Sequence, residues 1–244
     1  MPPPEDPAVV EMSHEIVDTL HGIFGSHPGK RPAHAKGILI HGTFDPTYEA
    51  SRLSTAPHFN QICIPVIARL SSSTGLPDLS DTDPNDIITH STPFFPVSNG
   101  PETLAFLQAT FAQARKPFPE SFATEKYFEV NTFVLVSTGG ERTLVVIAGD
   151  RTTDYRMVTS ELFAQVAQQG DATDDCTVLW PESRAEVKLG QVHLHSVMKD
   201  NETEQTRIIF DSVPRVEGIE PSGDPLIDTR AAAYLISGRE RHAA

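Results

Sequence analysis

The chain has 244 residues, of which 39% are apolar and 21% are charged, a mixture typical of one large globular domain or two small ones. Asp and Glu (33) outnumber Lys and Arg (19), so the formal net charge is −14. A chain this acidic is not expected to bind nucleic acid or an anionic membrane through its overall charge. The 20 prolines and 15 glycines favour many turns and argue against a bundle of long helices.

The sequence shows neither a disulfide pattern nor a targeting segment. Its two cysteines, Cys63 and Cys176, each sit in an apolar run, which predicts two buried free thiols. No run approaches the roughly 20 apolar residues of a membrane span, and the proline-rich residues 1–7 do not form a secretion signal. Residues 239–244 are not a peroxisomal address of the Ser-Lys-Leu type. We therefore expect an intracellular protein, in the cytoplasm by default, with the peroxisome left open.

In chain order, the apolar spacing predicts helices and strands in both halves of the chain. Residues 8–24 show helical spacing that ends near Gly25. Pro65 places the apolar strand around it at a sheet edge or a bulge, and Asp224 before Pro225 fits a helix N-cap followed by a first-turn proline. Strands are expected at 37–41, 62–70, 132–136, 143–148, 176–179, 187–197 and 206–210, helices at 102–114, 121–128, 161–169 and 224–241, a loop at 71–85, and a strand or tight turn at 86–97.

These elements indicate an α+β fold, most naturally a sheet or barrel with helices outside it. The strands 132–136 and 143–148 have the pattern of a hairpin across Gly139-Gly140. His193 and His195 alternate along one strand, so both would point from the same face. A metal hydrolase built on this pair is an alternative that lacks a third ligand at a usual spacing.

The last predicted helix carries an arginine and a tyrosine on one face. Arg230 and Tyr234 are four residues apart, and Arg241 falls on nearly the same face. A guanidinium beside a phenol favours the phenolate through its charge and hydrogen bonding. A phenolate is a hard anionic ligand, and tyrosine is one of the known axial ligands of haem iron. The alternative is an Arg–Tyr pair that only packs on the surface.

Three further positions carry chemistry that the sequence leaves open. His34 lies between a proline-containing loop and a strand, where it is either a general acid–base group or an exposed residue at a strand entrance. Arg69, on a mostly buried strand, needs an anion, which is either an internal carboxylate or a ligand's carboxylate or phosphate. His90 lies among small hydroxyl residues beside Phe94 and Phe95, either at a site or in a capped turn.

Read together, these and other short motifs resemble the haem catalase superfamily, most of all its small single-domain catalase-related peroxidases. The resemblance runs, with interruptions, from about residue 30 to residue 241, and the shared order of the motifs makes it specific. The matching stretches are Arg31-Pro-Ala-His-Ala-Lys-Gly37, His41-Gly-Thr-Phe-Asp-Pro-Thr47, Ala56-Pro-His-Phe59, Pro65-Val-Ile-Ala-Arg-Leu-Ser71, Thr74-Gly-Leu-Pro-Asp78, Asp81-Thr-Asp-Pro84, His90-Ser-Thr-Pro93, Phe118-Pro-Glu-Ser-Phe-Ala-Thr124, Trp180-Pro-Glu-Ser-Arg184, Ile208-Ile-Phe-Asp211, Gly218-Ile-Glu-Pro-Ser222 and Arg230-Ala-Ala-Ala-Tyr234.

The resemblance implies a fold, a reaction and a role for each matching residue. Residues 30–244 would form a haem-binding antiparallel β-barrel with surrounding helices, behind an N-terminal arm and helix at 1–29. The protein would bind haem b and reduce hydrogen peroxide or a small organic peroxide with a small organic electron donor; a homo-oligomer stays open. The implied roles are Tyr234 as iron ligand, Arg230 as its hydrogen-bonding partner, His34 as the distal proton shuttle, Ser71 as the hydroxyl bonded to that histidine, and Arg31, Arg69 and Arg241 as the groups that hold the haem propionates.

The chain departs from the family pattern in three places. His90 stands where large catalases carry a distal asparagine, which the smaller peroxidases tolerate and which would shift the chemistry toward peroxidase activity. Leu70 replaces a phenylalanine, which changes packing rather than chemistry. An apolar barrel strand is missing after Asn85, and residues 141–160 do not resemble the family's continuation. A splice variant or a gene-model error would explain the missing segments, and a barrel without that strand is expected to have two unpaired edges.

Two other functions remain open. A chain that lacks a barrel strand would keep the surface of the fold without haem and act as a non-catalytic interaction protein. A fatty-acid hydroperoxide-converting haem enzyme shares the Arg-x-x-x-Tyr helix. Haem uptake separates the first alternative from the peroxidase, and the peroxide that is turned over separates the second.

Overall fold

The computed structural model describes residues 4–80, 96–109, 127–151 and 158–244, and their strands form one antiparallel sheet. The strand order is β2-β1-β7-β6-β5-β4-β8, and the short β3 also pairs with β5. The strands are β1 (Gly37–Pro46), β2 (Ile64–Ser71), β3 (Tyr127–Phe128), β4 (Phe133–Val136), β5 (Arg142–Arg151), β6 (Val158–Val166), β7 (Glu186–Val197) and β8 (Ile219–Pro221). The helices are α1 (Pro7–Phe24), α2 (Tyr48–Leu53), α3 (Pro57–Asn60), α4 (Gly100–Ala109), α5 (Asn201–Arg207) and α6 (Pro225–Ala243).

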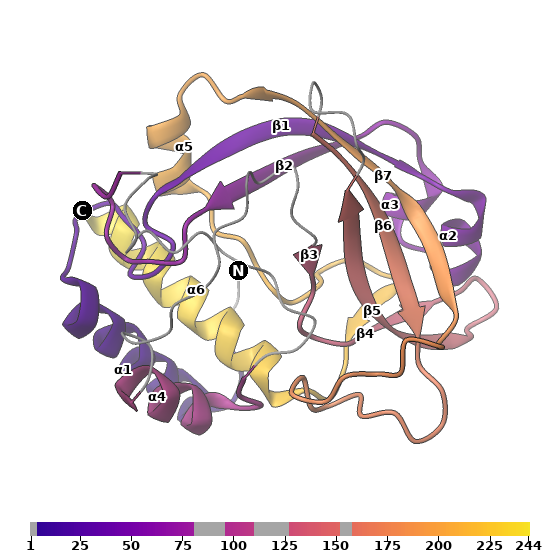
Figure 1. The fold of residues 1–244 in the computed structure, drawn as a ribbon, viewed down its shortest axis with the longest axis horizontal. Coiled ribbons are helices and arrows are strands. Elements are labelled where there is room, and N and C mark those ends of the chain that lie inside the picture. Colours follow the sequence, from indigo (N-terminus) through magenta and orange to yellow (C-terminus); the bar gives the residue numbers. More distant parts are fainter. Residues whose placement is uncertain (1–3, 81–95, 110–126, 152–157) are drawn as a thin grey trace.

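The sheet curves into a half-barrel that stays open (Figure 1). Among the described strands, β2 and β8 stand at the two ends of the order and do not pair with each other. The predicted α+β class and the incomplete barrel are therefore confirmed. Pro65 lies in the end strand β2, where its missing N–H removes no hydrogen bond from a central strand. The predicted segments within 81–95 and 110–126 lie outside the described residues.

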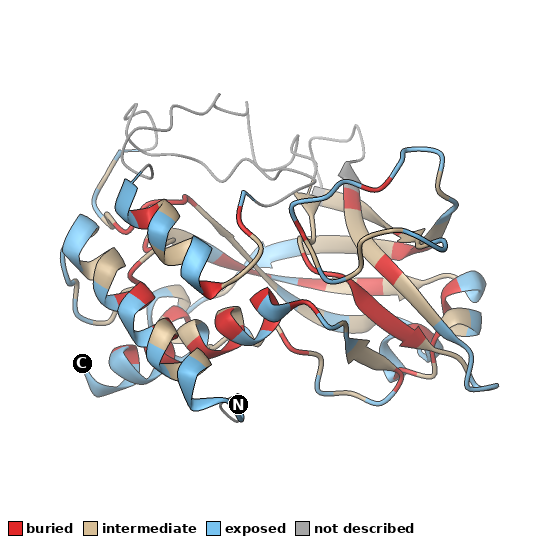
Figure 2. Cartoon of the chain, turned by 90° about the horizontal axis from the view of Figure 1, so that it is seen from below, coloured by how far each residue is buried: buried red, intermediate tan, exposed pale blue. Residues whose placement is uncertain are grey.

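One face of the sheet holds the main hydrophobic core. Because successive strand residues point to opposite faces, β1, β4, β5 and β7 send buried side chains to this face, among them Phe44, Leu135, Val145 and Leu189. The ring of Phe59 from α3 meets Phe44 edge to face, with 6.1 Å between the ring centroids. Figure 2 shows the buried residues along the strands and on the facing sides of the helices. This core fixes the sheet against which the helices lie.

The helices α1, α4 and α6 pack together beside the sheet (Figure 1). α6 begins as predicted, because the Asp224 carboxylate accepts a hydrogen bond from the backbone of Leu226 (2.8 Å). The Ser13 hydroxyl of α1 donates to the Thr229 carbonyl of α6 (3.2 Å), which joins two buried faces. Within the described ranges, no helix combines the length and the apolar character that a membrane crossing requires.

Several predicted elements are wrong, chiefly where long-range pairing decides the structure. Residues 161–169 were expected to be helical, but most of them lie in β6, because β5 and β7 offer backbone partners on both sides. Residues 206–210, expected as a strand, begin within α5 and continue without regular structure. Residues 176–179 form a turn instead of a strand, and Tyr127-Phe128 form β3 instead of a helix end.

Only one of the two cysteines is buried. Cys176 is buried as predicted, but Cys63 is exposed, and neither forms a disulfide. Cys63 lies in the tight connection before β2, with φ +51 and its backbone N–H donated to the Asp45 carboxylate (3.0 Å). This backbone geometry holds the thiol outside the core, so the apolar neighbours in the sequence gave the wrong expectation.

The position of Leu135 in the core predicts how much stability is lost when its side chain is shortened. Leu135 is fully buried, so Leu135→Ala is expected to lower the free energy of unfolding by about 2–5 kcal/mol through the cavity it leaves. Ile62→Ala, at a side chain that is 84% exposed, is expected to change it by less than about 0.5 kcal/mol. Chemical denaturation of both variants measures the difference, and equal effects would contradict the assignment of the core.

Candidate functional site

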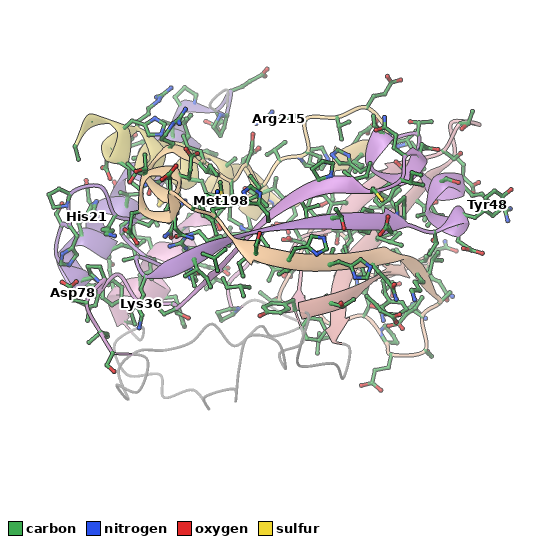
Figure 3. The ribbon with its side chains drawn as sticks, turned by 90° about the horizontal axis from the view of Figure 1, so that it is seen from above. His21, Lys36, Tyr48, Asp78, Met198 and Arg215 are labelled. Atoms are coloured by element: carbon green, nitrogen blue, oxygen red, sulfur yellow. The ribbon has the colours of Figure 1, made fainter. Side chains whose placement is uncertain are left out.

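A cavity of about 400 Å³ lies between α1, α6, β2 and the residues that precede β1. Figure 3 shows Lys36 just before β1 at one end of the molecule and Tyr48 of α2 at the opposite end, and the cavity lies toward the Lys36 end. Arg230 is not among the residues that line the cavity, and His90 lies outside the described residues. The cavity is lined by six of the eight residues that the sequence singled out: Arg31, His34, Arg69, Ser71, Tyr234 and Arg241.

Three arginines meet at this cavity without a carboxylate partner. Arg31 donates hydrogen bonds to the carbonyl oxygens of Gln205 (3.1 Å) and Ile208 (3.0 Å). Arg69 donates to the side-chain oxygen of the same Gln205 (2.8 Å), and Arg241 donates to the same Ile208 carbonyl (3.1 Å). In the part of the chain that the structure describes, no carboxylate forms an ion pair with any of the three. Their positive charges are therefore held by neutral acceptors.

Burial lowers the pKa of all three guanidinium groups, and repulsion from neighbouring arginines adds to this for Arg31 and Arg69. Burial, followed by repulsion from Arg69 and Arg241, lowers the pKa of Arg31 to about 9. Burial, followed by repulsion from Arg241, lowers the pKa of Arg69 to about 10, and burial lowers the pKa of Arg241. The charged forms thus cost free energy until an anion enters. Because none of the described lining residues is acidic, the cavity is suited to an anion with more than one charged oxygen.

His34 is held in one orientation by the backbone that follows β2. Its Nδ1 lies 2.8 Å from the Ser72 carbonyl oxygen and 3.4 Å from the Ser71 hydroxyl. Because a carbonyl oxygen only accepts, this contact favours the tautomer with hydrogen on Nδ1 and makes Nε2 the basic nitrogen. The residue has φ +56, an uncommon backbone conformation outside glycine, and Arg69 donates to its carbonyl oxygen (2.8 Å). Arg69 therefore positions His34 as well as supplying charge.

Tyr234 lines the cavity from α6 and lies against Arg230. It is 39% exposed, and the guanidinium carbon of Arg230 lies 6.0 Å from its ring centroid. The spacing of four therefore brings the two side chains together, as predicted. Glu129 pairs with the same guanidinium at 2.8 Å. Burial lowers the pKa of Arg230, but its interactions with Tyr234 and Glu129 outweigh burial and raise the pKa above its ordinary value.

A buried amide connects this arginine to the start of α6. Asn131 is 1% exposed; its Oδ1 accepts a hydrogen bond from Arg230, and its Nδ2 donates to Asp224 (2.7 Å). Asp224 is also the N-cap of α6, and burial raises the pKa of its carboxyl group, although these hydrogen bonds oppose that shift. The cap, the amide and the guanidinium thus form one chain of contacts that fixes the position of α6 and of Tyr234 on it.

Sequence reasoning missed three residues of this arrangement. Glu129 and Asn131 lie in the irregular segment between β3 and β4, about 100 positions from Arg230, and no local pattern marks them. Gln205 lies on α5, which the sequence did not predict as a helix. The available signal was general: a buried arginine needs acceptors. That requirement does not identify which residues provide them.

The histidine pair on β7 does not belong to the cavity. His193 contacts the Thr159 hydroxyl through Nδ1 (3.3 Å) and lies 3.8 Å from the Asp45 carboxylate through Nε2. His195 contacts the Thr43 hydroxyl through Nε2 (3.2 Å). Across the described ranges, no three metal-ligating side chains come together. The metal-hydrolase alternative therefore has no support in this part of the molecule.

Comparison with known proteins shows that the sequence is similar to catalase-related peroxidases and the fold to a catalase. No protein-family model matches the chain. It is 27% identical, over 294 aligned positions, to a protein named catalase-related peroxidase from Mycolicibacterium paratuberculosis (strain ATCC BAA-968 / K-10), with 93% of this chain and 94% of the relative covered. A catalase-related peroxidase from Synechococcus elongatus (strain ATCC 33912 / PCC 7942 / FACHB-805) is 27% identical over 160 positions, which cover 55% of this chain and 47% of that protein.

The structural comparison agrees with an incomplete barrel. The crystal structure of a fungal catalase matches with a TM-score of 0.72 and 14% identity, over 93% of this chain and 62% of the fungal chain. The half-barrel with its surrounding helices therefore has a catalase-like fold. The 294 aligned positions of the mycobacterial relative exceed the 244 residues of this chain, so the relative carries internal segments that are absent here. The sequence motifs likewise predicted that internal segments are missing from this chain.

The buried chain of contacts behind Tyr234 predicts a stability effect. Asn131→Ala removes one partner each from Asp224 and Arg230, so it is expected to lower the free energy of unfolding by about 1–3 kcal/mol. Gln168→Ala, at an exposed position, is the control and should stay within about 0.5 kcal/mol of the unmodified chain. Thermal and chemical unfolding measure both, and an Asn131→Ala variant as stable as the control would show that the amide contributes nothing.

Proposed function

We propose that this chain, which has a catalase-like fold and relatives named catalase-related peroxidase, is a haem-dependent peroxidase that reduces hydrogen peroxide or a small organic peroxide. The relatives named catalase-related peroxidase support peroxidase chemistry. The observation that carries the proposal is one cavity that joins a tyrosine, a histidine and three arginines without carboxylate partners among the described residues. In haem chemistry a tyrosine can bind iron, a histidine can transfer a proton and arginines can hold carboxylates.

The residues of the cavity fit haem b in their chemistry. Haem b carries two carboxylates, and Arg31, Arg69 and Arg241 would hold them, because guanidinium pairs with carboxylate through two parallel hydrogen bonds. Tyr234 would supply the oxygen that binds iron. Arg230, which keeps its positive charge beside that ring, would stabilise the phenolate form. An apolar part of the lining suits the porphyrin faces: Val17, Leu20, Ile67, Ile209, Phe210 and Ala233.

The proton transfer would belong to His34. When bound, haem supplies the redox-active iron that peroxide reduction needs. Nε2 of His34 would take the proton from one peroxide oxygen and deliver it to the other, so that the O–O bond breaks with water as the leaving group. The Ser72 carbonyl keeps hydrogen on Nδ1 and thereby leaves Nε2 to exchange the proton. In total, two electrons and two protons convert hydrogen peroxide to two waters, and a small organic donor would supply the electrons.

Two further residues complete the proposed distal side. Ser71 would contribute its hydroxyl contact with Nδ1 of His34, at 3.4 Å. His90 lies outside the described residues, and we propose it as the second distal side chain on the family resemblance alone. Its imidazole in place of an asparagine would favour peroxidase turnover over the dismutation of hydrogen peroxide.

The open sheet favours one alternative, a catalase-like protein that folds without haem and acts through its surface. Arg69 and Ser71 both lie on β2, which is an end strand among those described. Two of the cavity residues thus stand where the sheet has pairing on only one side. If that edge cannot hold them, haem would not be retained, and uptake of haem therefore distinguishes the two functions.

The ligand assignment predicts the absorbance of the haem-loaded protein. Chain expressed with haem supplied is expected to show a Soret band, and Tyr234→Phe is expected to lose it, because phenylalanine has no oxygen to bind iron. Tyr48→Phe is the matched control, since Tyr48 is 75% exposed at the opposite end of the molecule (Figure 3). Equal haem uptake by the two variants would show that Tyr234 is not the ligand. A folded unmodified chain that takes up no haem would support the non-catalytic alternative.

The proton-transfer assignment predicts a separate loss of rate. His34→Gln is expected to keep the Soret band but to lower the rate of peroxide reduction by about 10²–10⁴-fold, because the general acid–base group is gone. His14→Gln, at an exposed position on α1, is expected to leave the rate unchanged. Steady-state assays with hydrogen peroxide, and in parallel with a fatty-acid hydroperoxide, measure the effect. An unaltered rate in His34→Gln would remove the histidine from the mechanism.

A further inference from the structure

A second cavity, of about 370 Å³, lies between β5, β6 and the connection 167–185 that leads to β7. Its base is apolar and includes Val146 from β5 and Trp180 from the connection. Val178 and Leu179 also line it and are 49% and 52% exposed. Exposed aliphatic side chains around a buried tryptophan form a surface that an apolar ligand would cover.

The charge of this second cavity is opposite to that of the first. Four carboxylates line it, from Glu129, Asp175, Glu182 and Glu186, and its described lining contains neither lysine nor arginine. Glu182 and Glu186 are exposed and form no ion pair with any residue that the structure describes. An anionic ligand would be repelled here, whereas a cation would be attracted.

The wall of the second cavity is held in place by its own contacts. Arg184 donates two hydrogen bonds to the Asp171 carboxylate, both at 2.8 Å. This paired contact lowers the pKa of Asp171 to about 2, so the ion pair persists across the neutral range. The Trp180 indole N–H donates to the Ala172 carbonyl (2.6 Å). These contacts fix the connection without using the lining carboxylates, so the cavity is formed before a ligand arrives.

We propose that the second cavity binds an organic ammonium ion with an apolar, aromatic body. The ammonium would lie near Glu182 and Glu186, and the body would cover Val146, Leu179 and Trp180. A bare metal ion would make no contact with the apolar base, and a neutral ligand would not pair with the carboxylates.

Binding of this ligand can be measured directly at the cavity. Trp180 is the only tryptophan of the chain, so its fluorescence reports on this site alone. The probes are 2-phenylethylammonium, the neutral 2-phenylethanol and the anionic 3-phenylpropanoate, titrated into the full chain as purified, with calorimetry as a second measurement. The ammonium is expected to bind at least ~10-fold more tightly than the alcohol, and the anion more weakly than both. Equal binding of ammonium and alcohol, or no response of Trp180 to the ammonium, would overturn the proposal.

Two double variants with the same change of net charge test whether Glu182 and Glu186 cause the preference for the ammonium. Glu182→Gln with Glu186→Gln is expected to remove most of the preference for the ammonium over the alcohol. Glu141→Gln with Glu217→Gln, at exposed positions outside the cavity lining, is expected to keep it. An equal loss in both would mean that the overall acidity of the chain attracts the cation. The site does not depend on haem, so a failure of haem uptake and a failure of ammonium binding are distinguishable results.

Discussion

Three guanidinium groups share one cavity whose described lining contains no carboxylate, and their hydrogen bonds tie together the segments around it. Each buried charge costs folding free energy unless an acceptor or an opposite charge offsets it. Here Arg31 and Arg241 use the same carbonyl of Ile208, while Arg31 and Arg69 both use Gln205. The acceptors that they share therefore come from α5 and the residues just after it. This short segment joins the residues before β1, the end strand β2 and the helix α6 around one cavity.

Backbone carbonyls, the Gln205 amide and the Ser237 hydroxyl accept the hydrogen bonds of these arginines but do not neutralise their charge. Burial, and after it repulsion from neighbouring arginines, lowers the pKa values of Arg31 and Arg69. A cavity lined by apolar residues of similar volume would make a more stable protein without a ligand. It would not select an anion, however. In a chain with a net charge of −14, the grouping of three cations at one cavity is thus best understood as stability given up for binding.

Local rules predicted the local structure, and family resemblance predicted most of the cavity. The N-cap at Asp224, the β4–β5 hairpin and the shared face of Arg230 and Tyr234 follow from neighbours in the sequence, so they were predicted. The strand β6 was not, because its partners on both sides come from other parts of the chain. Asn131 was missed for the same reason: its contact with Arg230 spans 99 positions, and a single asparagine between strands carries no periodic signal.

The two cavities of opposite charge meet at one ion pair. Glu129 lines the acidic cavity, and its partner Arg230 lies against Tyr234, which lines the basic one. Because Arg230 already holds Glu129, the ammonium proposed for the acidic cavity is left to Glu182 and Glu186, and the ion pair beside Tyr234 stays intact.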